Sequence, residues 1–120
     1  MFKRKLDEGN AGEDIACRYL TNKGYKIITR NFRIRGGEID IIAVDGDTLA
    51  FVEVKTRTSK QFGTGLEAIG FWKIKALIKT AQIYKATHMN LPEAMRIDAV
   101  VVMLNKFNEI DSIELVKNIS

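Results

Sequence analysis

The spacing of apolar residues along the chain changes between a helical and an alternating pattern, and these changes divide it into helices and strands. An apolar stripe after Asn10 predicts a first helix from an Asn10 cap to about Lys23. A second stripe predicts a longer helix that ends near Thr87, with apolar residues spaced by three and four: Ile74, Leu77, Ile78, Ala81 and Tyr84.

Strand-like runs occupy much of the remaining sequence. They cover residues 25–34, 39–44, 48–56, 97–104 and 113–116. Short turns join the first three runs, which predicts an antiparallel meander, and the second helix then crosses over to a nearly all-apolar strand that is buried on both faces. This order predicts an α/β fold with a mixed sheet. No linker or repeat divides the chain, so we expect residues 1–120 to form a single domain.

Three charged residues interrupt the apolar pattern of two neighbouring strands. Asp40 lies in the second run, and Glu53 and Lys55 lie in the third. An isolated ionised group taken out of water costs roughly several kcal/mol, so charges inside strands usually have partners, a metal or a function.

A glycine-containing acidic turn joins these two strands and determines which residues pair. With a two-residue turn at Gly46 and Asp47, the numbers of paired residues sum to 93, and a four-residue loop keeps that sum. Asp40 then lies directly opposite Glu53, with Cβ atoms about 5 Å apart. A turn one residue earlier would change the sum to 91 and place Phe51 opposite Asp40.

The facing carboxylates allow two interpretations. Like charges across a ladder destabilise it, whereas a divalent cation reverses that interaction, so Asp40 and Glu53 predict a Mg²⁺ or Mn²⁺ site. Lys55 follows Glu53 on the same face, about 7 Å along, and an ammonium beside metal-bound water and a phosphate suits phosphodiester hydrolysis. Alternatively, Glu53 and Lys55 form the solvated face of the strand, and Glu38 pairs with Lys55 in a salt bridge worth less than ~1 kcal/mol.

Composition excludes several classes of protein. The chain is 46% hydrophobic and 28% charged, which is typical of a globular protein. We expect no membrane span and no export signal, and hence a cytoplasmic protein. The single cysteine, Cys17, excludes an intrachain disulfide, and with the single histidine, His88, it cannot supply a structural zinc site.

Basic residues are concentrated in the middle of the chain. Residues 23–85 contain twelve basic and six acidic residues, a net charge of +6 in a chain of +4. The predicted acidic site therefore lies within a basic segment, which favours a polyanionic partner bound through its phosphates. The lysines of the second helix, taken alone, are more typical of solubilising residues on an exposed face.

The motifs as a group resemble a known family. Glu13 on the first helix, Asp40 on one strand, and the triplet Glu53, Val54, Lys55 on the next resemble the PD-(D/E)XK nuclease superfamily. The wider run is similar to the YraN-like family of uncharacterised bacterial proteins, over about residues 9–102. It comprises Gly12-Glu13, Gly24-Tyr25, Arg30-Asn31-Phe32, Gly37-Glu38-Ile39-Asp40 and Phe51-Val52-Glu53-Val54-Lys55-Thr56-Arg57.

The resemblance implies a restriction endonuclease-like α/β/α core, in which helices flank a central mixed sheet, and metal-dependent cleavage of DNA. Asp40, Glu53 and the carbonyl of Val54 would bind Mg²⁺ or Mn²⁺, and Lys55 would position the attacking water and stabilise developing charge. Glu13 would orient Lys55 or hold a water on the metal. The superfamily's proline is absent, since Ile39 precedes Asp40. Similarity to the archaeal Holliday junction resolvases also suggests a homodimer, because a two-strand cut needs two sites.

Several placements and functions stay open at the level of sequence. Glu13 lies at the margin of its helix stripe and can face solvent or the sheet. Asp98, with Arg96, either belongs to the surroundings of the site or marks an exposed strand start. The candidate functions are a metal-dependent endonuclease for structured or branched DNA, a nucleic-acid-binding module without significant catalysis, and an adaptor. Candidate phosphate contacts are Arg30, Arg57 and Lys60.

Overall fold

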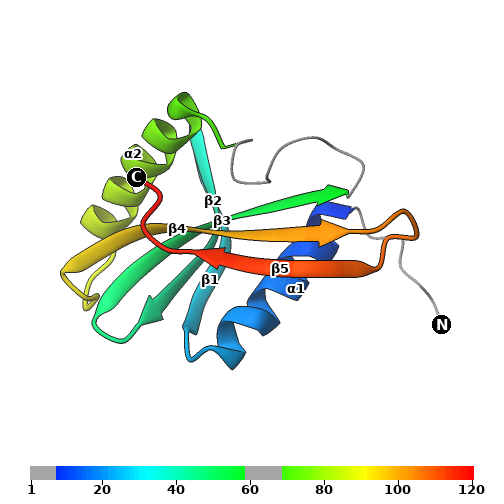
Figure 1. Cartoon of the computed structure of the whole chain (residues 1–120). Helices are drawn as coiled ribbons and strands as arrows, with labels where there is room; N and C mark the ends of the chain where they lie inside the picture. The colour runs from blue at the N-terminus through cyan, green and yellow to red at the C-terminus, as the bar shows by residue number, and fades with distance from the viewer. Residues whose placement is uncertain (1–7, 59–68) are drawn as a thin grey trace.

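The computed structural model describes residues 8–58 and 69–120 as two helices and five strands (Figure 1). The helices are α1 (Glu8–Asn22) and α2 (Phe71–Thr87). The strands are β1 (Lys26–Ile34), β2 (Gly37–Asp45), β3 (Thr48–Thr58), β4 (Ala94–Leu104) and β5 (Ile110–Val116). The first helix therefore begins before Asn10, so the predicted Asn10 cap is wrong.

The five strands form one mixed sheet in the order β1-β2-β3-β4-β5. The first three are antiparallel neighbours, β4 is parallel to β3, and β5 returns antiparallel to β4. A parallel neighbour needs a crossover connection, and α2 lies within it. The predicted meander, crossover and α/β class are thereby confirmed.

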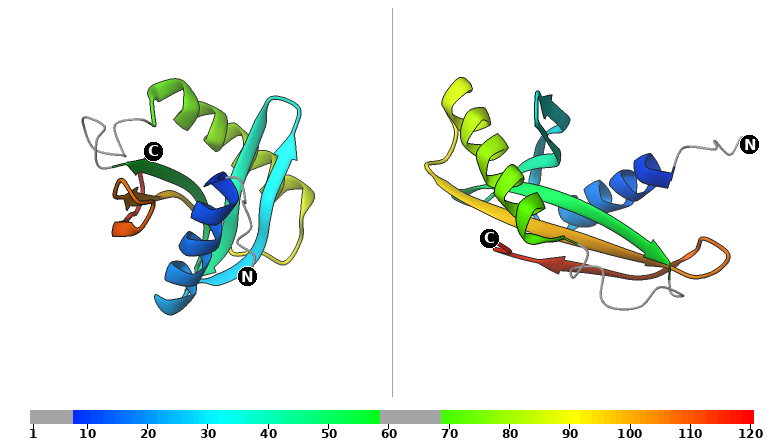
Figure 2. Two further views of the ribbon diagram at one scale, coloured as in Figure 1. Left: turned by 90° about the vertical axis from the view of Figure 1, so that its right-hand side faces the viewer. Right: turned by 90° about the horizontal axis from the view of Figure 1, so that it is seen from above.

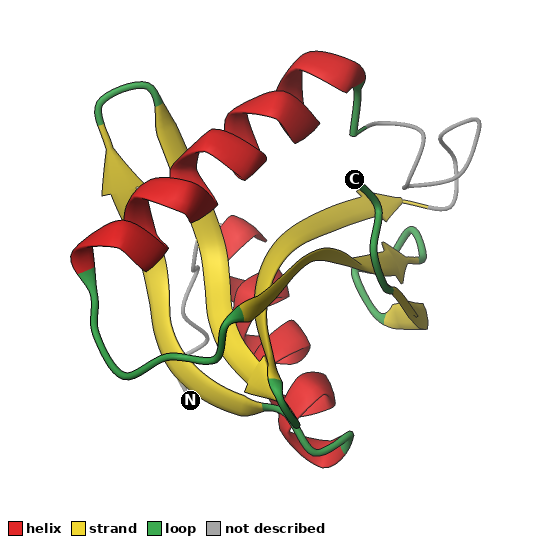
Figure 3. Ribbon diagram, turned by 90° about the vertical axis from the view of Figure 1, so that its left-hand side faces the viewer, coloured by secondary structure: helices red, strands yellow, loops and turns green. Residues whose placement is uncertain are grey.

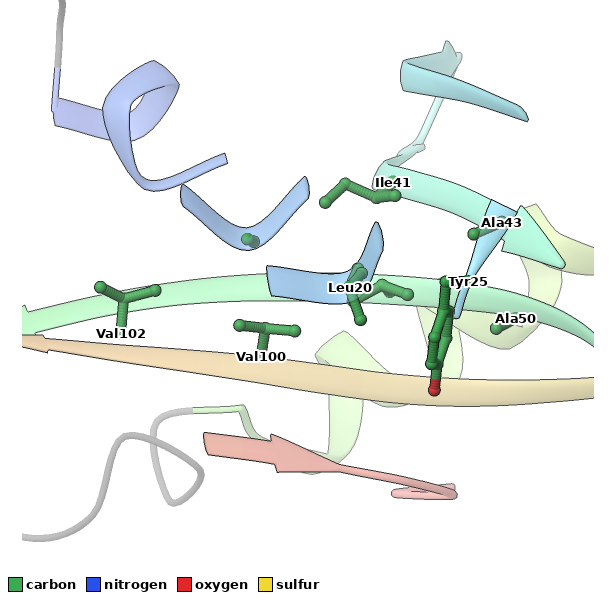
Figure 4. Close-up of a cluster of buried hydrophobic side chains, with 9 residues drawn as sticks. Leu20, Tyr25, Ile41, Ala43, Ala50, Val100 and Val102 are labelled. Atoms are coloured by element: carbon green, nitrogen blue, oxygen red, sulfur yellow. The ribbon is translucent and has the colours of Figure 1, made fainter. Parts of the chain in front are cut away.

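The two helices cover opposite faces of the sheet (Figures 2 and 3). Beneath α1, Ala16 and Leu20 pack with Tyr25 and with small and branched residues of the central strands (Figure 4). Beneath α2, Leu77, Ala81 and Tyr84 pack on a second buried cluster that includes Phe51. The expected α/β/α layering follows, because each helix buries its apolar stripe on its own face of the sheet.

The turn between β2 and β3 has the predicted geometry. Asp45 pairs with Thr48 around a two-residue turn, and every pair up to Ile41 and Val52 sums to 93. The alternative turn, which would have placed Phe51 opposite Asp40, is excluded because Phe51 pairs with Ile42.

Beyond Ile41 and Val52 the two strands separate, and we call this place the fork. Residues 37–39 of β2 continue to pair with β1, whereas β3 continues beside β4 (Figure 3). Asp40 and Glu53 are the first residues past the last ladder pair, one on each branch. The fork opens space for polar side chains inside an otherwise continuous sheet.

Glycine lets each helix approach one branch of the fork closely. A Cβ on Gly12 of α1 would collide with Oγ1 of Thr56 on β3. A Cβ on Gly37 of β2 would likewise collide with Oγ1 of Thr80 on α2. The two contacts hold α1 against one branch and α2 against the other, on opposite faces of the sheet.

Candidate active site at the fork

Asp40 is fixed by the backbone of the opposite branch. The Val54 N–H donates a hydrogen bond of 2.8 Å to Oδ2 of Asp40, replacing the ladder bond that ends at the fork. The N–H and C=O of one residue in an extended strand point to the same side, so the Val54 carbonyl also faces the fork. Oxygen donors of Asp40 and Val54 thus face each other across the fork, and Glu53 is the residue next to Val54 on β3.

The two acidic side chains at the fork lie close to each other, Glu53 buried and Asp40 half-buried. Glu53 is 7% exposed, and burial, followed by the nearby charge of Asp40, raises its pKa from the usual 4.5 to about 7. Burial also raises the pKa of Asp40, and the hydrogen bond from Val54 opposes that rise. Both shifts mean that the protein holds these carboxylates where the ionised form is disfavoured.

Glu13 faces the sheet and not the solvent. It is 8% exposed, and burial, with the charge of Asp40 as the next cause, raises the pKa of Glu13. Arg30 holds it from β1, with 3.5 Å between Nη2 and Oε1, and contacts Asp14 at 2.8 Å. The third acid predicted for the site therefore lies near Asp40 and has a cationic partner.

Asn31 is a neighbour of Glu13 that the sequence analysis did not select as a site residue. Its φ of 54° lies in the left-handed region, which asparagine tolerates better than most residues other than glycine. Its side chain hydrogen-bonds Glu13 and lowers the pKa of that carboxyl. Such backbone outliers cluster at functional sites, and an asparagine within a strand run was the available sequence signal.

Lys55 shares a hollow with two of the predicted acids. The hollow has a volume of about 490 Å³ and is lined by Glu13, Asp40 and Lys55, together with Glu38 and the end of β3. Glu53 does not line it and lies on the α2 side, where it contacts Lys73. Three of the four predicted catalytic residues thus share one hollow, and the fourth adjoins Asp40.

Lys73 is a second site residue that the sequence analysis missed. Its Nζ lies 3.6 Å from Oε2 of Glu53, and it lowers the pKa of that carboxyl. Lys73 stands one helical turn before the buried Leu77, so it extends the apolar stripe toward the sheet. This position on the apolar stripe of the helix could have identified Lys73 from the sequence.

The other predicted contacts have separate outcomes. Glu38 pairs with Arg33 on β1 at 3.1 Å, and the β2–β3 ladder ends before it could face Lys55, so the expected cross-strand pairing with Lys55 is wrong. Among the candidate phosphate contacts, Arg30 is engaged with Glu13 and Asp14, and Arg57 lines the hollow. Lys60 lies outside the described residues.

The donors at the fork fit a hard divalent cation. Oε1 of Glu53 is buried without a hydrogen-bond partner, although buried carboxylate oxygens nearly always have one. Carboxylate and carbonyl oxygens are the ligands that Mg²⁺ and Mn²⁺ prefer. Within residues 8–58 and 69–120, no three acidic, cysteine or histidine side chains converge, so a protein-bound cation would depend on two carboxylates and the Val54 carbonyl.

Asp98 belongs to a different cluster. It is fully buried, so an exposed strand start is wrong, and it accepts hydrogen bonds from Tyr25, Arg96 and the Asn118 N–H. Arg96 also reaches Asp45, at 2.7 Å. This network ties β4 to the turn after α1 and to the chain's last residues, and none of its members lines the hollow at the fork.

None of the helices in the described part of the chain is long and apolar enough to cross a membrane.

Comparison with known sequences identifies the family. The model of the uncharacterised protein family UPF0102 matches residues 12–102, a range that includes the whole fork. A UPF0102 protein of Clostridium kluyveri is 40% identical over 118 residues, covering 98% of this chain and 97% of the relative. UPF0102 proteins of Clostridium botulinum (strain 657) and Caldicellulosiruptor saccharolyticus are 47% and 44% identical, covering 93% and 98% of this chain and 92% and 98% of their own lengths. The chain therefore belongs to the UPF0102 family, the YraN-like family that its motifs resemble.

Proposed function

We propose that this protein is a metal-dependent endonuclease that hydrolyses phosphodiester bonds of structured or branched DNA. The observation that carries the proposal is the pair of neighbouring carboxylates at the fork, the half-buried Asp40 and the buried Glu53, with Lys55 in the adjoining hollow. Two neighbouring acids whose ionised forms are both disfavoured do not stabilise the fold, so the fold alone does not explain why this pair is present.

Asp40, Glu53 and the Val54 carbonyl would hold Mg²⁺ or Mn²⁺. When bound, the cation supplies neutralisation of the two carboxylates and polarisation of a phosphoryl oxygen. The Val54 N–H keeps Asp40 oriented, which restricts its motion before any ligand arrives. The ammonium of Lys55 would donate hydrogen bonds to the phosphate and stabilise charge that develops during attack.

Glu13 would act in the same hollow. Arg30 and Asn31 hold its carboxyl in the hollow that Asp40 also lines, where it can accept a hydrogen bond from the attacking water or orient Lys55. The basic middle segment would attract the phosphates of the substrate, and Arg57 and Lys60 are candidate contacts with them. A two-strand cut would require two such sites, so we expect a homodimer on branched DNA.

A cleavage assay with matched variants tests the proposal. Pure protein is incubated with branched, duplex and single-stranded DNA and with RNA, each with Mg²⁺ or Mn²⁺. Cleavage should fall by at least about 10²-fold in Glu53→Gln and Lys55→Ala. It should be unchanged in Asp47→Asn, which alters an exposed acid in the β2–β3 turn. Equal cleavage by all four proteins would show a contaminating nuclease and sink the proposal.

A nucleic-acid-binding module is the second candidate, and one observation favours it. Lys73 already neutralises part of Glu53, and no third acid converges with the pair in the described residues. A site of this kind would bind metal weakly. A calorimetric titration with Mn²⁺ separates the two candidates. The nuclease requires Mn²⁺ binding that is lost in Asp40→Asn, whereas the binding module predicts salt-dependent DNA binding in the absence of Mn²⁺ binding.

A further inference from the structure

Two large aromatic side chains project into solvent where α2 begins. Phe71 and Trp72 are 64% and 76% exposed, although residues of their size are usually buried. Their ring centroids lie 5.1 Å apart with an interplanar angle of 79°. Because the rings are nearly perpendicular, the pair can offer ring faces in two directions. We call the pair the aromatic platform.

Lysines of α2 lie next to the aromatic platform, and no acidic residue of that helix offsets their charge. Nζ of Lys75 lies 5.2 Å from the centroid of the Phe71 ring, and Lys73 follows Trp72 directly. Helix α2 carries four lysines and no acidic residue. The platform therefore combines ring faces with positive charge, which is the combination that binds bases together with their phosphates.

The platform is connected to the fork through Lys73. That lysine contacts Glu53, and it also lines a second hollow of about 320 Å³ between α2 and the β1–β2 turn. Glu38 lines both this hollow and the one that contains Lys55. A strand whose phosphate lies in the hollow of Lys55 can thus reach the start of α2 through the second hollow, where Arg33, paired with Glu38, and Lys73 offset the charge of that acid.

We propose that Phe71 and Trp72 stack unpaired bases of a nucleic-acid strand whose backbone is bound at the fork. This inference rests on the proposed function and narrows it to substrates with unpaired nucleotides next to the cut, such as branch points, flaps or frayed ends. A second protein surface is disfavoured as the occupant, since lysine is depleted at the centres of protein interfaces, whereas here Lys75 lies over the Phe71 ring and Lys73 follows Trp72 in the helix.

The unique tryptophan gives a direct readout. Trp72 is the only tryptophan of the chain, so its emission reports on the platform alone. With EDTA present to prevent cleavage, an unstructured single-stranded oligonucleotide should quench this emission, and a blunt duplex of the same length should quench it much less. Trp72→Ala should weaken binding of a labelled single strand by about tenfold or more, since stacking contributes roughly 1–3 kcal/mol per base. Its duplex affinity should change by less than about twofold.

Further variants separate stacking from general damage. Trp72→Phe keeps a ring and should retain most of the single-strand affinity. Lys75→Gln should lower the slope of log affinity against log salt by about 0.7, the value for one phosphate contact on a single strand. Met89→Ala removes an equally exposed apolar side chain just beyond the other end of α2 and should have no effect.

Three results would overturn the platform. The first is an unchanged single-strand affinity in Trp72→Ala, and the second is an equal loss of affinity for single strand and duplex in that variant. The third is a Trp72 emission that depends on protein concentration without nucleic acid, which would indicate that a second copy of the chain covers the platform. Because binding is measured without metal, this test is independent of cleavage. If the wild-type protein cleaves DNA and Trp72→Ala binds a single strand as tightly as wild type, the platform is wrong and the nuclease proposal stands. If the wild-type protein binds single strands selectively through Trp72 but cleaves nothing, the nuclease proposal is wrong and the platform stands.

Discussion

Two buried acids on neighbouring strands of one sheet have opposite surroundings. Asp98 on β4 accepts four hydrogen bonds, two of them from the same Arg96 guanidinium. Glu53 on β3 has one oxygen near Lys73 and the other without a hydrogen-bond partner, with the carboxylate of Asp40 nearby. Both are at least 93% buried, so burial alone does not distinguish them.

The difference separates a structural carboxylate from one that suits binding or catalysis. A buried charge with all its partners contributes to a defined fold, and breaking its network is costly. A buried charge that lacks partners raises the free energy of the ligand-free protein, which a cation could lower by completing its coordination. We therefore expect substitutions at the two acids to change stability in opposite directions.

Asp98→Asn should cause the largest loss of stability. It leaves Arg96 and the Tyr25 hydroxyl facing an amide inside the protein, and we expect the free energy of unfolding to fall by roughly 3 kcal/mol. Urea denaturation at pH 7 measures it. Asp45→Asn removes the more exposed carboxylate from the same arginine and should cost about 1 kcal/mol or less. Similar losses for both variants would contradict the distinction.

Glu53→Gln should increase stability at high pH. The folded protein raises the pKa of Glu53 from 4.5 to about 7, so the protonated form is favoured on folding and wild-type stability falls as pH rises between these values. The amide cannot ionise. At pH 8 the variant should exceed wild type by on the order of 2 kcal/mol, and the difference should vanish near pH 4. If Glu53→Gln is less stable than wild type at both pH values, the Glu53 carboxylate stabilises the fold as that of Asp98 does.

Mn²⁺ affinity should depend on pH around the pKa of Glu53. Protonated Glu53 must lose its proton before it can bind a cation, so affinity should fall about tenfold for each pH unit below about 7 and level off above it. Calorimetry at several pH values, in buffers of different ionisation enthalpy, measures both the affinity and the released proton. Affinity that does not vary between pH 5 and 8 would place the metal elsewhere.

Lys73→Gln should have the smallest effect. Lys73 is 40% exposed in its side chain, so loss of its ion pair should change stability by less than about 1 kcal/mol. Because Lys73 lowers the pKa of Glu53, its removal should raise that pKa further. Carboxyl NMR titration measures the shift, and Lys79→Gln, an exposed lysine of the same helix, should leave it unchanged.

Local sequence signals were sufficient for the sheet as far as the fork. Gly46 and Asp47 form a turn whose length sets the register, and that register brings Asp40 and Glu53 close together just past the last ladder pair, although not as the directly paired residues that were predicted. The ladder then ends at Ile41 and Val52, and nothing in the sequence of the turn predicts that end. The separation depends on α1 and α2 packing on different branches, a tertiary effect, and it is why Glu38 pairs with β1 instead of Lys55.

Partners from distant parts of the chain were harder to predict. Asp98 was visible as a charge in an apolar strand, but its partners Tyr25 and Asn118 lie 73 and 20 residues away. Lys73 was treated as one of several helix lysines, since its contact with Glu53 depends on how α2 crosses the sheet. The acids were therefore predictable from residue type and register, whereas the groups that tune them were not.

The fork also bears on aggregation. Where strands part, each branch presents a short edge: residues 37–40 of β2 and 53–56 of β3 have a neighbouring strand on one side only in the described structure. Exposed edges invite pairing with strands of other molecules, and charged side chains on them discourage it. Glu38, Asp40 and Lys55 occupy these edges, so the charges proposed for catalysis would also help to keep separate molecules from joining through their sheets.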